Sequence, residues 1–190
     1  MRVLFCGVGA LGSTAATLCR TLPAELAFVD HDRVESRNLL SQAYTKQAVG
    51  RNKAEALRLQ LRNFYGVTAV AFGVRLERSN VATLAGSADL LVDCLDNEAG
   101  RSVLSGHARS AGTPLVHAGI SGDGTFGLVR WDERFTPDPE DTPGQATCAG
   151  GEHLPMIGQL SAALARVVQD FVAQGTRRDA MVTLTSVTVQ

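Results

Sequence analysis

Apolar residues in the first part of the chain form short continuous runs, separated by segments in which they recur at helical spacing. The short runs are strand-sized and lie at residues 2–6, 25–29, 67–74, 88–92 and 115–118. The helical spacing, with a period near 3.6, occurs at residues 10–20, 52–64 and 98–111. Strands that alternate with helices in this order predict a doubly wound, Rossmann-like α/β sheet.

The pattern changes after residue 118. Closely spaced glycines interrupt a strand-like run at residues 125–131, which predicts a hairpin, and residues 132–151 are rich in Pro, Gly and acidic residues. A helix is predicted at residues 156–174, and the alternation at 180–189 predicts one last edge strand. We therefore expect a single domain over residues 1–190. Its sheet is mostly parallel, with antiparallel strands towards the C-terminus and a crossover loop at about 132–151.

The composition favours a folded, cytoplasmic protein. Hydrophobic residues make up 45% of the chain and charged residues 19%, and both values are compatible with a buried core. The formal net charge is −1, and no run of like charge could follow a phosphate backbone, so nucleic acid is not an expected partner. No apolar run approaches the roughly 18 residues of a membrane span, and the N-terminus lacks a signal-peptide pattern.

The segment between the first strand and the first helix reads G-V-G-A-L-G at residues 7–12. In a G-x-G-x-x-G turn, Gly7 allows the tight turn, Gly9 lets the backbone approach a phosphate group, and Gly12 lets helix and strand pack closely. Asp30 ends the next strand, where an acid accepts hydrogen bonds from ribose hydroxyls. A plain tight turn and a nicotinamide or flavin site remain alternatives at this point.

Three further motifs follow in order. Residues 30–42 read D-H-D-R-V-E-S-R-N-L-L-S-Q, residues 49–54 read V-G-R-N-K-A, and residues 89–97 read D-L-L-V-D-C-L-D-N. Over about residues 2–175 the chain resembles the ThiF/MoeB/ubiquitin-activating enzyme superfamily, as a minimal member. The resemblance implies an ATP-dependent adenylyltransferase that activates the C-terminal carboxylate of a small ubiquitin-like or sulfur-carrier protein ending in Gly-Gly.

Adenylation brings a carboxylate against a polyanion, so the site needs positive charge. Lys53 would supply a fixed charge for the triphosphate, and Asp96, at a strand's carboxyl end, would hold Mg²⁺. The resemblance adds Asp32, Asn38 and Gln42 to the nucleotide site. The alternatives are that Lys53 is a solvated helix residue and that Asp96 only caps the next helix.

Cysteines provide a candidate nucleophile. The four cysteines form no C-x-x-C pair, so neither a zinc site nor a disulfide framework is expected. Cys148 lies at the end of the long loop, and the resemblance implies that it takes the carrier from its adenylate as a covalent adduct; an incidental loop cysteine is the alternative. Cys6, Cys19 and Cys94 lie in predicted strands and helices and are expected to be core thiols.

One departure bears on activity. The family has an arginine where this chain has Ser41, and Arg33 and Arg37 are the nearby cations that could replace it. A scaffold with weakened catalysis, an enzyme acting on a small-molecule carboxylate and an NAD-dependent oxidoreductase therefore remain alternatives. The resemblance also implies a homodimer.

Overall fold

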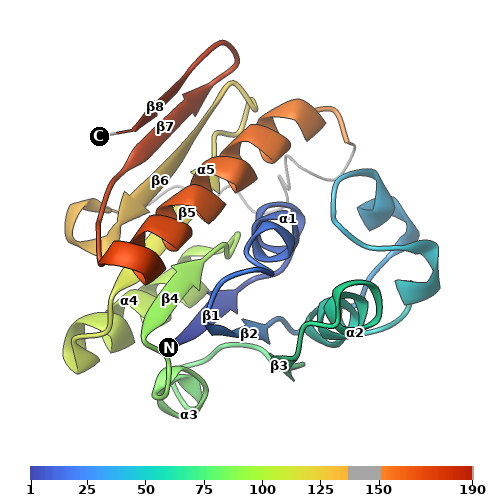
Figure 1. The fold of residues 1–190 in the computed structure, drawn as a ribbon, viewed down its shortest axis with the longest axis horizontal. Coiled ribbons are helices and arrows are strands. Elements are labelled where there is room, and N and C mark those ends of the chain that lie inside the picture. The colour runs from blue at the N-terminus through green and yellow to red at the C-terminus, as the bar shows by residue number, and fades with distance from the viewer. Residues whose placement is uncertain (137–150, 190) are drawn as a thin grey trace.

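The computed structural model describes residues 1–136 and 151–189 (Figure 1). Their strands form one eight-stranded sheet in the order β3-β2-β1-β4-β5-β6-β7-β8. The pairs among β1 to β5 are parallel, and those from β5 to β8 are antiparallel. The strands are β1 (Arg2–Cys6), β2 (Glu25–Val29), β3 (Ala69–Phe72), β4 (Leu90–Asp93), β5 (Leu115–Ile120), β6 (Phe126–Trp131), β7 (Ala180–Thr183) and β8 (Val187–Val189). The predicted fold class is confirmed.

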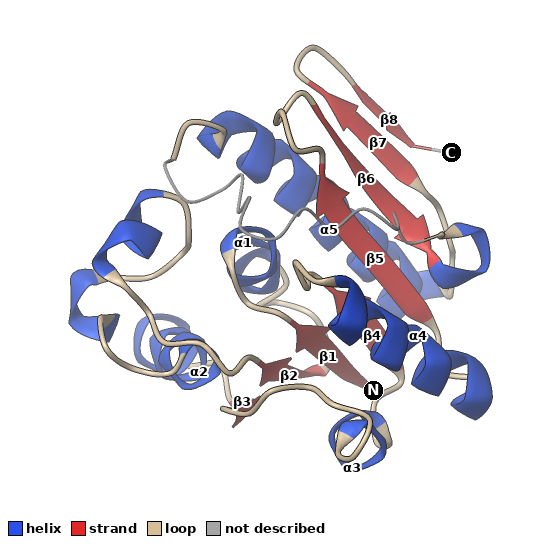
Figure 2. Cartoon of the chain, turned by 180° about the vertical axis from the view of Figure 1, so that it is seen from behind, coloured by secondary structure: helices blue, strands red, loops and turns tan. Residues whose placement is uncertain are grey.

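Helices cover both faces of the sheet, because alternate strand residues are apolar on both sides. Val3 and Phe5 pack in one core cluster with residues of α1 (Ala10–Leu18), α2 (Lys53–Tyr65) and α5 (Leu154–Gln174). Leu4 and Cys6 pack in a second cluster with α3 (Val81–Ala85) and α4 (Glu98–Ala111). Figure 2, which shows the molecule from behind, places α3 and α4 on the face opposite α5. Short 3₁₀ helices lie at η1 (Ser36–Leu40), η2 (Lys46–Ala48) and η3 (Asp132–Arg134).

Asparagine caps fix where the two central helices begin. Asn52 accepts a hydrogen bond from the Glu55 N–H at the start of α2, and Asn97 accepts one from the Gly100 N–H at the start of α4. Such caps satisfy amides that have no partner inside the helix. The alternative that Asp96 caps α4 is wrong, because the neighbouring Asn97 takes that position.

The long helix α5 crosses the sheet diagonally in Figure 1. Its apolar face, which includes Leu160, Leu164 and Phe171, is buried, and the helix contacts α1, β6 and β7. It begins at Leu154, slightly before the predicted start, and Pro155 occupies its first turn, where a missing N–H costs no hydrogen bond. Among the described residues, no helix is both long and apolar enough to cross a membrane.

The structure corrects the expectation of one strand at residues 180–189. Two strands, β7 and β8, occupy this segment and pair as a hairpin, with β8 at the sheet edge. Thr183 Oγ1 lies 2.8 Å from Ser186 Oγ, and the Thr183 N–H donates to the Ser186 carbonyl. Local bonds of this kind compete with a continuous ladder and turn the chain. Helix α3 was not predicted from the sequence, and most of the expected crossover loop lies outside the described residues.

A carboxylate fastens the start of β7 to the end of β6. Asp179 accepts a hydrogen bond from the Trp131 N–H at 3.1 Å and pairs with Arg134 through both carboxylate oxygens, at 2.7 and 3.0 Å. Burial alone would raise the pKa of the Asp179 carboxyl, but these hydrogen bonds and the Arg134 charge outweigh it, and the pKa is lowered. The ionised form is therefore the one that stabilises this junction.

We expect Asp179→Asn to lose stability at neutral pH and to match the parent in acid. A carboxyl whose folded pKa lies below its ordinary value of about 3.9 stabilises the fold above that value, and the contribution is lost as the pH falls through the folded pKa. Thermal unfolding between pH 7 and pH 3 measures the gap between the two proteins. Glu133→Gln is the control, because its pair with Arg177 is exposed. A gap that stays constant with pH would contradict the assignment.

Candidate functional site

The glycine turn joins β1 to α1 and has two closely packed positions and one open position. A Cβ atom on Gly7, whose φ is +83°, would lie 2.7 Å from the Cys94 carbonyl oxygen, and one on Gly12 would lie 2.0 Å from the Gly7 carbonyl oxygen. A Cβ atom on Gly9 would meet no atom within 4 Å. Gly7 and Gly12 are therefore required by packing, whereas Gly9 leaves a space in front of the first turn of α1.

Asp30 ties this turn to the end of β2. Its Oδ2 accepts a hydrogen bond from the Val8 N–H and its Oδ1 accepts one from the Asp32 N–H, both at 2.9 Å. Asp30 is buried, and this burial raises the pKa of its carboxyl despite both bonds. Each oxygen still has capacity to accept another hydrogen bond, so ribose binding by Asp30 stays a prediction.

Lys53 lies beside Asp32 at the start of α2. Its Nζ is 2.9 Å from Asp32 Oδ2, and only 10% of the lysine side chain is exposed, against 50% of the aspartate side chain. Burial alone would raise the pKa of the Asp32 carboxyl, but the hydrogen bond and charge of Lys53 lower it overall. The alternative of a solvated Lys53 is wrong: the structure brings a buried ammonium group to the carboxyl end of β2.

Two residues that were not predicted as site residues, Asn52 and Tyr44, hold this arrangement together. Asn52 Nδ2 donates to the carbonyls of Asp30, at 2.8 Å, and Asp32, at 3.1 Å. The Tyr44 hydroxyl donates to the Val8 carbonyl at 2.6 Å, and burial raises the pKa of that hydroxyl. Asparagine before a helical segment is a readable cap signal. Nothing in the local sequence distinguishes Tyr44 from an ordinary core aromatic residue.

The two predicted polar phosphate ligands differ in their surroundings. Asn38 Oδ1 accepts a hydrogen bond from the Glu35 N–H at 2.8 Å, so its oxygen supports the 3₁₀ helix η1. Gln42 Oε1 is buried and has no hydrogen-bond partner among the described residues. An amide oxygen accepts hydrogen bonds and cannot donate one to a phosphate oxygen, so the roles of Asn38 and Gln42 as phosphate ligands stay predictions.

Ser41 stands where the resemblance implies an arginine. It is buried, and its Oγ has no hydrogen-bond partner within the described part of the chain. Arg33 donates to the Gly50 carbonyl at 2.7 Å, and Arg37 pairs with Glu35 at 2.7 Å. Both candidate replacements therefore have other partners in this structure.

Asp96 is exposed and lies in the loop between β4 and α4. The preceding residues, Cys94 and Leu95, pack against Gly7, so this loop borders the glycine turn. Its role as a Mg²⁺ ligand stays a prediction. Among the described residues, the cluster with metal-ligand geometry is instead Asp30, His31 and Asp32, whose ligand atoms lie within 4.8 Å of one another.

The described cysteines are unsuited to nucleophilic attack. Cys6 and Cys19 are buried, as expected of core thiols, and burial raises the pKa of Cys19 to about 12. Cys94 is less buried than expected, although desolvation also raises the pKa of its thiol. Cys148 lies outside the described residues, and its role stays a prediction.

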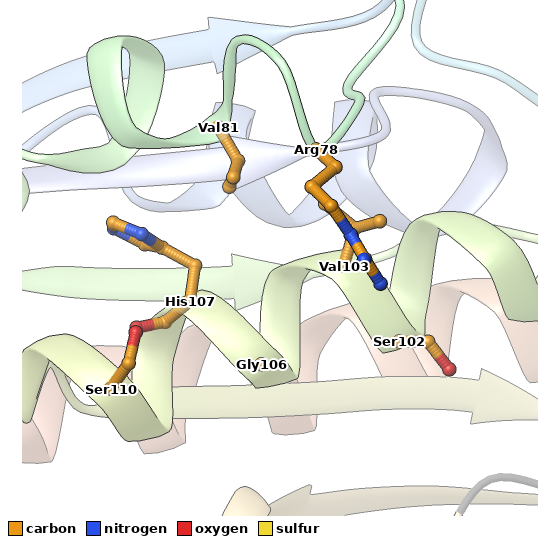
Figure 3. Close-up of a pocket in the computed structure, with 7 residues that line it drawn as sticks. All are labelled: Arg78, Val81, Ser102, Val103, Gly106, His107 and Ser110. Atoms are coloured by element: carbon orange, nitrogen blue, oxygen red, sulfur yellow. The ribbon is translucent and has the colours of Figure 1, made fainter.

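A separate groove of about 300 Å³ lies between α3 and α4. Figure 3 shows Arg78 extending towards Ser102 and Val103, whereas the His107 ring points towards Val81. The polar groups therefore do not converge on one point. The glycine turn with Asp32 and Lys53 is the stronger candidate site.

A doubly wound sheet with a glycine turn, an acid after the second strand and a buried lysine beside it defines a Rossmann-type nucleotide-binding domain. The model of the ThiF family matches residues 1–161, and the chain belongs to this family.

Two curated relatives are similar to the chain. The adenylyltransferase and sulfurtransferase MOCS3 of Caenorhabditis briggsae is 31% identical over 192 residues, covering 90% of this chain and 46% of MOCS3. The SAMP-activating enzyme E1 of Haloferax volcanii is 35% identical over 122 residues, covering 63% of this chain and 45% of that enzyme. The chain thus spans less than half the length of either relative.

Solved structures confirm the fold. MccB of E. coli, determined with ATP, has a TM-score of 0.77 at 16% identity. The match covers 100% of this chain and 62% of the MccB chain. PaaA has a TM-score of 0.74 at 16% identity, with the same coverage of both chains.

Two alanine substitutions separate packing from ligand binding in the glycine turn. We expect Gly12→Ala to lower the free energy of unfolding by about 1–3 kcal/mol or more, because its Cβ would overlap backbone. We expect Gly9→Ala to stay within about 1 kcal/mol of the parent, the scale of a helix-cap change, and to weaken ATP binding about tenfold or more by filling the phosphate approach. Denaturant unfolding and calorimetric titration with ATP and Mg²⁺ measure both effects. Parent-like ATP affinity in Gly9→Ala would place the nucleotide elsewhere.

Proposed function

We propose that this chain is an adenylation domain that uses ATP and Mg²⁺ to activate the C-terminal carboxylate of a small ubiquitin-like or sulfur-carrier protein. The buried Lys53 carries the proposal: it pairs with Asp32, and the Tyr44 hydroxyl that bonds the Val8 carbonyl of the glycine turn also donates to the Lys53 carbonyl at 3.3 Å. A buried ammonium group is costly unless it is paired, and here its partner Asp32 is half exposed. The membership in the ThiF family and the names of the curated relatives support the choice of reaction.

The proposed reaction joins two anions. A carboxylate oxygen of the carrier attacks the α-phosphorus of ATP, the bond from that phosphorus to the bridging oxygen breaks, and pyrophosphate leaves. Lys53, whose side chain is only 10% exposed, offsets the charge repulsion with a fixed positive charge. Gly9 leaves room for phosphate groups next to the amides at the start of α1.

The residues present also fit a Mg²⁺ ion that arrives with the nucleotide. Asp96 offers an exposed carboxylate in the loop beside the glycine turn, and hard carboxylate oxygens suit this ion. When bound, Mg²⁺ would supply positive charge to the phosphate oxygens.

A scaffold that binds nucleotide without turnover is the second candidate. The observation that favours it is Ser41, buried at the position of the family's arginine, together with the engagement of Arg33 and Arg37 elsewhere. ATP binding without pyrophosphate exchange, in the presence of a carrier ending in Gly-Gly, would support this candidate. Exchange with a small carboxylic acid would point to a different substrate, and calorimetry with NAD in place of ATP tests the redox alternative.

We expect the parent to exchange labelled pyrophosphate into ATP only with its carboxylate partner present, and Lys53→Ala to lower that rate by about 10²-fold or more, the usual effect of losing one preorganised charge contact. Lys46→Ala is the matched control, because Lys46 is exposed at η2. Equal exchange in the Lys53 and Lys46 variants would remove Lys53 from the site.

A second experiment separates the two half-reactions. We expect Cys148→Ala to keep pyrophosphate exchange but to lose a dithiothreitol-sensitive adduct with the carrier, measured by intact mass without reductant. Asp96→Ala should lose both, because the cation acts in the first step. Cys19→Ala, which alters a buried thiol, should keep the adduct. An adduct that persists in Cys148→Ala would assign the nucleophile to another cysteine.

A further inference from the structure

The loop of residues 94–97 places Asp96 between the end of β4 at Asp93 and the start of α4 at Glu98. The loop has little freedom on the side of the glycine turn, because a Cβ atom on Gly7 would lie 2.7 Å from the Cys94 carbonyl oxygen and 3.0 Å from the Leu95 nitrogen. Because Asp96 directly follows Leu95 in the chain, the orientation of the Leu95 backbone sets where Asp96 lies relative to the turn.

Both backbone polar groups of Leu95 are held by side chains of the network behind the loop. Its N–H donates to Asp93 Oδ1 at 2.9 Å, and its carbonyl accepts a hydrogen bond from Arg101 Nη2. Arg101 Nη2 also donates to the Ala118 carbonyl at 3.2 Å, and Nη1 lies 3.2 Å from Asp93 Oδ2. One guanidinium group thus joins the loop, the end of β4 and strand β5.

Asp93, which pairs with Arg101, is itself held by further contacts, and these restrain the position of Arg101. Asp93 is fully buried, and its Oδ2 is also 2.7 Å from Nδ1 of the buried His117. The other ring nitrogen of His117 lies 3.0 Å from Asp132 Oδ1. Phe135 stacks on the His117 ring with centroids 3.9 Å apart, and the Arg101 guanidinium lies 5.7 Å from the Phe135 ring centroid. The network is therefore packed as well as hydrogen-bonded.

We propose that Arg101 is a positioning residue that sets the place of the Asp96 carboxylate relative to bound nucleotide, acting through the Leu95 carbonyl and Asp93. The proposal rests on the function proposed above. The planar fork of arginine reaches all three acceptors at once, which a lysine ammonium group on a flexible stem does not reproduce. Residues that orient a metal ligand commonly change metal affinity by 10–100-fold when they are altered.

The test is the Mg²⁺ dependence of pyrophosphate exchange at saturating ATP in the parent and in Arg101→Lys, which keeps the charge. We expect the half-saturating Mg²⁺ concentration to rise about tenfold or more, with thermal unfolding close to that of the parent. Arg109→Lys is the matched control: Arg109 lies on the same helix and binds Asp132 at the far end of the network, without contacting Leu95. An unchanged Mg²⁺ dependence in Arg101→Lys would overturn the proposal.

Amide hydrogen exchange of residues 94–97 provides a readout that does not require activity. We expect faster exchange in Arg101→Lys than in the parent and in Arg109→Lys, because the loop loses its carbonyl anchor. Parent-like protection of this loop would overturn the positioning role. Absence of pyrophosphate exchange in the parent would instead contradict the proposed function, and hydrogen exchange would still decide whether Arg101 holds the loop.

Discussion

The close approach of three backbone segments at the glycine turn determines how the candidate site is built. The end of β1, the first turn of α1 and the loop after β4 meet where Gly7 and Gly12 have no side chains, and any Cβ atom there would overlap backbone. Because protein interiors are packed as densely as organic crystals, such a contact leaves little room for adjustment. These contacts therefore hold the first turn of α1 and the loop that carries Asp96 close together, and the hydrogen bonds of Asp93 and Arg101 to Leu95 then orient the loop.

Charged side chains then orient the backbone segments and side chains around the glycine turn. Asp30 uses both carboxylate oxygens to bind amides of the turn and of the following segment, and Lys53 pairs with Asp32 next to it. Behind the loop, Arg101 pairs with the fully buried Asp93. Burying an unpaired charge would cost several kcal/mol. Lys53 and Asp93 can therefore be buried only because each is paired with a group of opposite charge. Two of the three predicted catalytic groups consequently differ: Lys53 is held in place by its pair with Asp32, whereas the position of Asp96 depends on its loop.

The family membership and the site together leave a specific chemical question. The chain has the glycine turn, Lys53 and the acidic residues of the motifs, and it has Ser41 where the resemblance implies an arginine. Its hydroxyl is buried and without a partner among the described residues, while Arg33 and Arg37 bind other groups. Under the proposed function, the positive charge expected from such an arginine would come from Lys53, from the metal ion or from residues outside this chain.

The order of strands and helices and the position of the glycine turn could be predicted from the sequence, because hydrophobic periodicity and glycine spacing are local properties. The same holds for the buried core cysteines Cys6 and Cys19. The split of the last strand was missed because the Thr183 and Ser186 bonds that turn the chain give no periodic signal. The burial of Lys53, the hydrogen bonds of Tyr44 and Arg101 and the Asp93–His117 contact were decided only by the tertiary structure. Each of these features depends on contacts between residues far apart in sequence. Hydrophobic periodicity and local motifs do not report such contacts, so they could not be predicted from the sequence.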